Sequence, residues 1–246
     1  MGPHVLPGGS PMKDYLKKKP LYDYRSYGGW GLQRPEHGTL GRFDPAMTKL
    51  LPDGRTFELK MQFDRPAYLM YTEAGATHEK ALHNSLRCGS WASLYNVKGE
   101  GYWSMWVKNP PSWTTEMVAM LWPEEDSRWP EGEINFMETQ SDKTKTQLNL
   151  HWPSPKDRSP QHWPVTIDLD TRQWHKYGVR IYPDCVRWFV DDKLVRHLDT
   201  EFSPYNTTLH FAVQCGVNQN FGVMWHKDIA WEENMYIIPE RAPGIL

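Results

Sequence analysis

Two glutamates, Glu133 and Glu138, stand close together in the segment 129–138, with Asn135 between them. Two carboxylates on one wall of a groove can cleave a glycosidic bond, because one attacks or stabilises the anomeric carbon while the other protonates the leaving oxygen. A separation of about 5–5.5 Å gives retention of configuration, and about 6.5–9.5 Å leaves room for the water of inversion. The sequence leaves this distance open, and ordinary exposed strand carboxylates are the alternative interpretation.

Side chains in a regular strand alternate between its two faces. This alternation places Glu133 and Asn135 on one face and would turn Glu138 to the other, apolar face. One β-bulge near Phe136 and Met137 restores the phase, because a bulge adds a single residue to one strand of a pair. We therefore predict a bulged strand whose polar face lines a groove and whose apolar face packs on a second sheet.

The segment 132–138 resembles the signature of the family-16 glycoside hydrolases, the laminarinase, lichenase and agarase-like enzymes, which reads Glu-x-Asp-x-x-Glu after a Trp-Pro-x-Gly lead. Other parts of the chain resemble further segments of the same family, namely 43–47, 101–108, 174–179 and 184–191. The resemblance covers about residues 40–240. It implies a concanavalin A-like jelly roll that acts as a retaining endo-glycosidase on a β-linked polysaccharide, with Glu133 as nucleophile and Glu138 as general acid/base.

Asn135 departs from the family signature, which has Asp at this place. An Asp can share a proton with the nucleophile and couple to both carboxylates through its charge, whereas an amide can only donate an N–H or accept at its oxygen. We expect Asn135 to hold Glu133 and to favour its ionised form. The substitution is therefore expected to reduce the activity or to shift its pH dependence.

Neighbouring segments supply the expected binding residues. His151 and Trp152 resemble the family's His-Trp pair, in which the His faces the cleft near the acid/base, and Gln214 is expected to project into the cleft in the same way. The chain has 13 Trp, an unusual excess. Because a sugar presents C–H faces that pack on aromatic planes, we expect some tryptophans to line the groove and the others to pack in the core; those assigned to the groove are Trp113, Trp122, Trp129 and Trp152.

Short β-like segments with turn signals between them must position these residues. The expected strands cover 56–63, 101–108, 116–122, 133–138, 146–152, 176–182, 208–215 and 226–238. The clearest hairpin joins 186–190 to 193–196 through Asp191 and Asp192. Since no long segment shows an amphipathic helical period, the pattern predicts an all-β fold, a two-sheet antiparallel β-sandwich.

Residues 1–37 are rich in Pro, Gly and Tyr, and this composition predicts an irregular N-terminal arm. Residues 38–246 are then expected to form one glycoside-hydrolase-like jelly-roll domain. The tyrosines give the arm contact area. The arm could therefore lie along its own domain or dock on a protein partner, and the sequence does not decide between these alternatives.

Composition excludes several classes of function. The 246 residues carry 28 Lys+Arg and 30 Asp+Glu, and a net charge of -2 gives no general field for nucleic acid. No segment approaches the ~18–20 apolar residues of a membrane span. The three cysteines are too scattered for a disulfide framework or a zinc site, and Cys185 and Cys215 are expected to be buried. No cofactor is expected, and Asp168 and Asp170 are favoured as turn carboxylates over a structural calcium site.

A second hypothesis keeps the fold but not the reaction. A carbohydrate-binding or structural module with weakened or lost catalysis would fit Asn135 and the tyrosine-rich arm, whereas the intact glutamate pair favours an enzyme. The first residues hold no apolar signal segment, although members of the resembled family are usually secreted. We therefore expect action on an extracellular or cell-wall glycan and leave the localisation open, with a phage particle as one setting.

Overall fold

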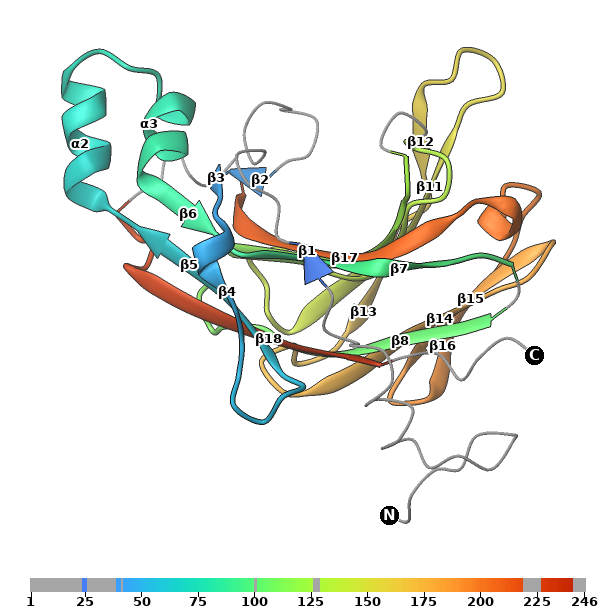
Figure 1. Ribbon diagram of the computed structural model, residues 1–246. Coiled ribbons are helices and arrows are strands. Elements are labelled where there is room, and N and C mark those ends of the chain that lie inside the picture. The colour runs from blue at the N-terminus through green and yellow to red at the C-terminus, as the bar shows by residue number, and fades with distance from the viewer. Residues whose placement is uncertain are drawn as a thin grey trace.

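The computed structural model describes residues 24–25, 39–40, 42–99, 101–125, 129–218 and 227–240. Within these residues the strands form two sheets that pack face to face, so the predicted all-β sandwich is confirmed (Figure 1). Of the predicted arm 1–37, only β1 (Tyr24–Arg25) lies within the described residues, where it pairs with β7.

The first sheet carries the candidate site. Its strand order is β1, β7 (Ser90–Val97), β17 (Leu209–Asn218), β9 (Thr115–Pro123), β10 (Ile134–Thr139), β11 (Lys145–Pro153) and β12 (Pro160–His162). Two further strands join it off this path, β13 (Val165–Asp168) beside β11 and β2 (Thr39–Leu40) beside β17.

The second sheet covers the back of the first. Its strand order is β16 (Lys193–Asp199), β15 (Cys185–Val190), β14 (His175–Ile181), β8 (Gly101–Lys108), β18 (Glu232–Glu240), β5 (Phe57–Phe63), β6 (Leu86–Cys88) and β3 (Arg42–Phe43), with β4 (Thr48–Leu50) beside β5. The strands pair antiparallel except for β3 and β6, which run parallel. Most predicted strand positions agree closely with these bounds, but the strand expected over 226–238 begins only at Glu232, because residues 227–231 form turns and residue 226 lies outside the described residues.

The core lies between the sheets and follows the alternation of the strands. On β5, for example, Phe57, Leu59, Met61 and Phe63 are buried, as the sequence pattern predicts. Part of the tryptophan excess belongs to this core, since Trp91, Trp103 and Trp188 are fully buried. The three cysteines are free and buried. At the predicted β15–β16 hairpin, Asp191 and Asp192 have φ values of 50° and 63°, which match a primed two-residue turn.

The structure contains two α-helices that the sequence pattern did not predict. Helix α2 (Arg65–Glu73) is capped by Asp64, whose side chain accepts a hydrogen bond from the Ala67 N–H. Helix α3 (His78–Ser85) is capped by Thr77. Both are too short to show a clear amphipathic period, so their signal lay in these capping residues. They stand together at one end of the sandwich, while β11 and β12 rise at the other (Figure 1). Two short 3₁₀ turns connect strands, η2 (Pro45–Met47) between β3 and β4 and η4 (Pro204–Asn206) between β16 and β17.

No helix among the described residues has the length and apolar character needed to cross a membrane.

Candidate active site

A β-bulge in β10 sets the direction of the second glutamate. Strand β10 pairs with β9 up to Asn135, and the pairing resumes at Met137, which leaves Phe136 as the extra residue. Phe136 and Met137 are both buried in the core. The phase is therefore reset, and Glu138 shares the outer face of the sheet with Asn135, as the sequence predicted.

The strand register aligns further polar residues with the two glutamates. Glu138 pairs with Gln147 on β11 and, on its other side, with Val118 on β9. Val118 pairs in turn with Gln214 on β17, so these four residues form one row across the sheet. Directly paired residues in an antiparallel sheet point to the same face. Gln214 is half-buried and lies on the expected face, two strands from Glu138.

Two histidines, His151 and His162, lie across the neighbouring strands from Glu133. The His151 N–H donates to the Glu133 carbonyl oxygen at 2.9 Å, and His151 pairs in turn with His162 on β12. The two imidazole rings are 5.7 Å apart between centroids. The dipeptide His-Trp occurs twice, at 151–152 and 162–163, and the β11–β12 hairpin brings the two copies together. This repeat was the sequence signal that could have identified His162.

Glu133 is buried, with 7% of its surface exposed, and its carboxylate lies among polar groups. The Trp129 indole Nε1–H donates to Glu133 Oε2, and His151 Nε2 lies 3.6 Å from Oε1. The Trp129 ring stacks on Trp122, with 6.4 Å between centroids and 17° between planes. Gly132 has a φ of 101°, a value that favours glycine, and it leads the chain into β10. Trp122 and Trp129 therefore lie beside Glu133, on the expected side of the sheet.

Asn135 contacts Glu138, which corrects the expectation that it would hold Glu133. Its Nδ2 donates to Glu138 Oε2 at 3.1 Å and lies 3.5 Å from His151 Nε2. The reason is the bulge, because it turns Glu138 alongside the amide. Burial raises the pKa of Glu138, and the negative charge of Glu133 adds to this rise, while the Asn135 hydrogen bond opposes it.

His151 is neutral at neutral pH. Burial lowers its pKa to about 4, although the charge of Glu138 opposes this shift. The 3.6 Å approach to Glu133 is therefore a contact with a neutral ring and not an ion pair. Asn149 Nδ2 lies 3.0 Å from His151 Nε2 and donates to it. Asn149 was not among the predicted site residues; its place in the site follows from its register opposite Asn135.

Two buried amide oxygens at the site have no hydrogen-bond partner among the described residues, Asn135 Oδ1 and Asn149 Oδ1. Buried polar atoms in native proteins are nearly always hydrogen-bonded. These oxygens belong to the buried polar cluster around His151.

Two of the predicted tryptophans lie elsewhere. Trp152 belongs to the main core and stacks on Phe202 at 5.5 Å, which corrects its assignment to the groove. The physical reason is strand alternation, because His151 faces outward and its neighbour must face inward. Trp113 is 38% exposed and precedes β9, at the opposite end of that strand from Trp122. The length of β9 therefore separates Trp113 from the stacked tryptophans beside Glu133.

No group of His, Cys, Asp and Glu side chains with metal-binding spacing lies at this site within the described part of the chain; the one such group there is on β15 and β16. The carboxylate of Asp170 pairs with Arg172 at 2.7 Å. Asp170 therefore has a cationic partner within its own turn.

The model of the glycosyl hydrolases family 16 matches residues 60–233, which is more than half of the chain. The chain belongs to glycosyl hydrolase family 16. Membership supports glycosyl hydrolase activity in general terms, and the expected family resemblance is confirmed. A search of curated proteins gave no match.

Solved structures of this family share the fold at low sequence identity. LamAcat from Zobellia galactanivorans aligns with a TM-score of 0.67 at 15% identity, covering 87% of this chain and 88% of that one. The laminarinase catalytic domain from Thermotoga maritima aligns with a TM-score of 0.68 at 14% identity, covering 91% and 92%. A Bacteroides ovatus family-16 protein from a mixed-linkage glucan system aligns with a TM-score of 0.67 at 16% identity, covering 91% and 97%.

Proposed function

We propose that this glycosyl hydrolase cleaves a β-linked glucan by a retaining double displacement, with Glu133 as nucleophile and Glu138 as general acid/base. The observation that carries the proposal is the bulge at Phe136, because it brings Glu138 to the face of β10 that it shares with Asn135. If the same residues paired regularly, without the bulge, the second carboxylate would point into the core and could not reach a substrate bound on the outer face.

The environments of the two carboxylates support different roles. Burial raises the pKa of Glu138, which favours the protonated form that a general acid needs. Glu133 accepts a hydrogen bond from the Trp129 indole, and a donor of this kind stabilises an ionised carboxylate. Pairs of carboxyl groups whose surroundings favour opposite protonation states are typical of acid and nucleophile pairs.

The proposed reaction has two steps. Glu138 gives its proton to the leaving glycosidic oxygen while a Glu133 oxygen bonds to the anomeric carbon, which forms a covalent glycosyl-enzyme. Glu138, now ionised, then takes a proton from water as that water attacks the anomeric carbon and the bond to Glu133 breaks. Two inversions give net retention. The neutral His151 and the amide of Asn135 are in place to position the two carboxyl groups.

A neutral glucan fits the groups that surround the glutamates. Trp129, which is half-buried and stacked on the buried Trp122, offers aromatic surface beside Glu133. Laminarinases and a protein of a mixed-linkage glucan system share this fold, which makes laminarin and mixed-linkage β-glucan the first substrates to test.

The test measures the release of reducing ends from laminarin, mixed-linkage β-glucan and β-galactans, with the anomeric configuration of the first product followed by NMR. We expect retention and a loss of activity of about 10²–10⁴-fold in Glu133→Gln and Glu138→Gln. Glu131→Gln is the matched control, because Glu131 lies close in sequence but pairs with Arg158. Turnover that is unaffected by Glu133→Gln would contradict the proposal, and binding without any turnover would indicate a binding module.

A further inference from the structure

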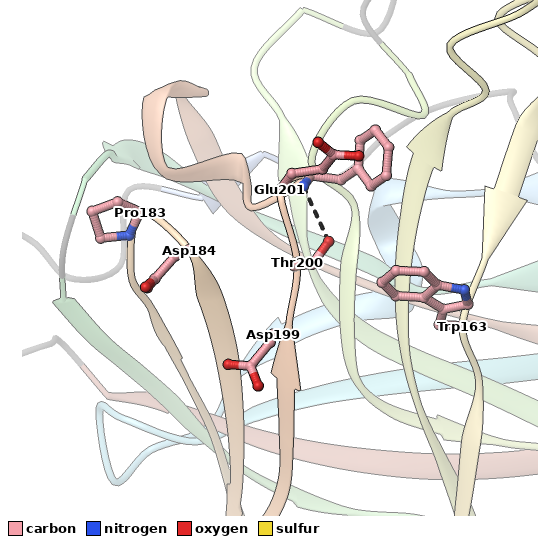
Figure 2. Close-up of a pocket in the computed structure, with 7 residues that line it drawn as sticks. Trp163, Pro183, Asp184, Asp199, Thr200 and Glu201 are labelled. Atoms are coloured by element: carbon pink, nitrogen blue, oxygen red, sulfur yellow. Dashed lines mark hydrogen bonds between the residues drawn. The ribbon is translucent and has the colours of Figure 1, made fainter.

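An open hollow of about 810 Å³ lies at the edge of the sandwich, away from the glutamates. The turn between β12 and β13 forms one side, and the chain segments before β15 and after β16 form the other (Figure 2). Its lining consists of Trp163, Pro183, Asp184, Asp199, Thr200, Glu201 and Phe202. The volume lies within the ~300–1,000 Å³ range of ligand pockets.

Trp163 is the aromatic wall of the hollow. Its ring packs against Trp152, with 4.2 Å between centroids, and Trp152 stacks on Phe202. Because Trp152 belongs to the core, this packing holds the Trp163 ring in place while 36% of the residue stays exposed. A fixed and exposed indole face suits the C–H face of a sugar ring, since such contacts lose little side-chain entropy on binding.

Three carboxylates, those of Asp184, Asp199 and Glu201, accompany Trp163 around the hollow (Figure 2). The Thr200 N–H donates to the Asp184 carbonyl oxygen at 2.8 Å, which ties the two segments together. Carboxylates accept hydrogen bonds from hydroxyl groups, and three of them repel anionic ligands. The lining therefore favours a neutral polyhydroxylated ligand.

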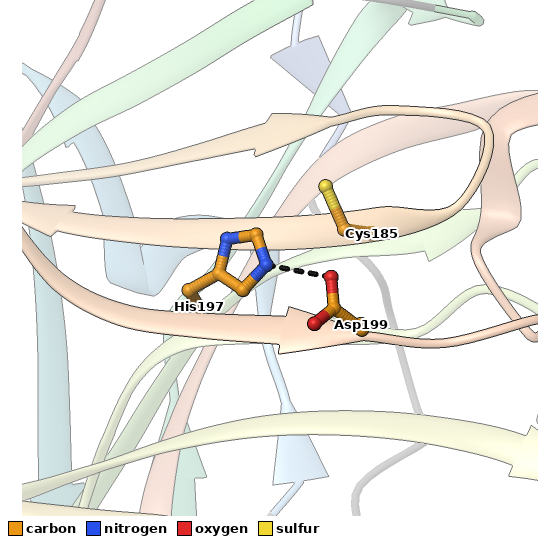
Figure 3. A group of neighbouring side chains, drawn as sticks. All are labelled: Cys185, His197 and Asp199. Atoms are coloured by element: carbon orange, nitrogen blue, oxygen red, sulfur yellow. Dashed lines mark hydrogen bonds and ion pairs between the residues drawn. The ribbon is translucent and has the colours of Figure 1, made fainter.

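The Asp199 carboxylate also belongs to a group with Cys185 and His197, whose ligand atoms lie within 4.8 Å of one another (Figure 3). The Arg187 Nε–H donates to His197 Nδ1 at 2.9 Å, so Nε2 carries the ring proton and donates to Asp199 Oδ1 at 2.7 Å. Both ring nitrogens are therefore in use, and His197 has no lone pair to offer a metal ion. The same bond fixes the Asp199 carboxylate at the hollow.

The hollow adjoins the candidate active site along the chain at the end of β12. His162 pairs with His151 in the row of Glu133, and Trp163 is the next residue along the chain. Because neighbouring residues point to opposite sides, His162 faces the candidate site while Trp163 faces the hollow. A polysaccharide that leaves the outer face over β12 would meet Trp163 at this edge.

We propose that this hollow is a second glycan-binding site, which holds a neutral stretch of a polysaccharide outside the catalytic residues. The substrate class rests on the proposed function. The hollow contributes affinity for long chains, whereas short oligosaccharides that fill only the catalytic face do not reach it.

The test compares Trp163→Ala with Trp174→Ala, both in a Glu133→Gln background that blocks turnover. Trp174 is a matched control, because it is 37% exposed and precedes β14, whereas the hollow lies beyond the other end of that strand. We expect Trp163→Ala to weaken binding of laminarin and mixed-linkage β-glucan about tenfold, and Trp174→Ala to leave binding unchanged. With Glu133 restored, Trp163→Ala should hydrolyse a short glucan oligosaccharide with unchanged kcat/KM.

If Trp163→Ala fails to fold, Glu201→Gln tests the second site instead, because Glu201 is exposed and its substitution should leave the fold intact. This variant should weaken polysaccharide binding and should relax discrimination against a carboxymethylated glucan. Equal binding by the parent, Trp163→Ala and Glu201→Gln would overturn the proposal, and so would equal losses at Trp163 and Trp174. If the wild-type protein cleaves no glucan but binding still depends on Trp163, the proposed function fails and the second site stands.

Discussion

Asn135 Nδ2 donates a hydrogen bond to Glu138 Oε2 over 3.1 Å, so the amide that lies between Glu133 and Glu138 in the sequence contacts Glu138. The family signature expects an acidic residue at this place, and an aspartate would bring a third negative charge to the pair. The amide instead opposes the rise in the pKa of Glu138 that burial and the charge of Glu133 produce. This relationship makes the pH dependence of activity the property most sensitive to residue 135.

Asn135→Asp is expected to shift the alkaline limb of the kcat/KM profile to higher pH. The substitution removes the donor and adds a negative charge, and both changes raise the pKa of Glu138 further. A general acid stays active up to its pKa, so the activity should persist at higher pH. Asn84→Asp is the control, because it adds the same charge on α3, where the Asn84 side chain donates to the Lys80 carbonyl oxygen. A limb that moves to lower pH in Asn135→Asp would contradict this role.

Trp129→Phe tests the indole donor to Glu133. The ring is retained and the N–H is lost, so the carboxylate loses one stabilising hydrogen bond. We expect kcat to fall about 10- to 100-fold, in line with the ~1.5–3 kcal/mol of a hydrogen bond to a charged group, with little change in KM. Trp122→Phe keeps a ring against Trp129 and should leave kcat within about twofold. Equal kcat values for Trp129→Phe and the wild type would argue against the contact.

His151 makes the fold sensitive to acid. Its pKa is lowered to about 4 in the folded protein, against 6.5 for an unperturbed His, so the unfolded chain takes up the proton first as pH falls. The stability is fully present above about pH 6.5 and is lost as pH falls toward 4, by about 3 kcal/mol. His151→Gln should therefore flatten the free energy of unfolding between about pH 7 and pH 4, as urea titrations can measure. The same slope in both proteins would contradict the assignment, and exposed His197→Gln is the control.

Deletion of Phe136 tests the bulge. The remaining residues would then pair regularly with β9 and Glu138 would stay on the outer face, so the main cost is the loss of the buried Phe136 side chain, about 3–5 kcal/mol of stability. Phe136→Leu keeps the register and loses only volume, so it should remain folded and active. Thermal unfolding and reducing-end assays of the two variants provide the comparison. The deletion variant should keep its activity to the extent that it folds, because both glutamates remain on one face; a folded deletion variant without activity would contradict this account.

Much of the site could be predicted because strand alternation is a strict rule. The polarity of Glu138 on an otherwise apolar face required a bulge, and the structure has it at Phe136. The same rule shows why the prediction for Trp152 was wrong, since the outward direction of His151 obliges its neighbour to face the core. A His-Trp pair on one strand cannot present both side chains to the same groove.

Other features depend on geometry that spacing in sequence does not contain. The partner of Asn135 follows from how the bulge turns Glu138, and only coordinates reveal that turn. Helices α2 and α3 are too short to carry a periodic signal. The hollow at Trp163 is assembled from two segments far apart in the sequence, and their meeting follows from the packing of the two sheets.

The most direct test of the proposed mechanism is to trap the glycosyl-enzyme with a 2-fluoro glucan oligosaccharide that has an activated leaving group. The adduct is then located by peptide mass spectrometry. We expect one added sugar chain on the peptide that contains Glu133, and its attachment to that carboxylate. An adduct on Glu138, or continued turnover of the reagent without any adduct, would contradict the assignment of Glu133 as the nucleophile.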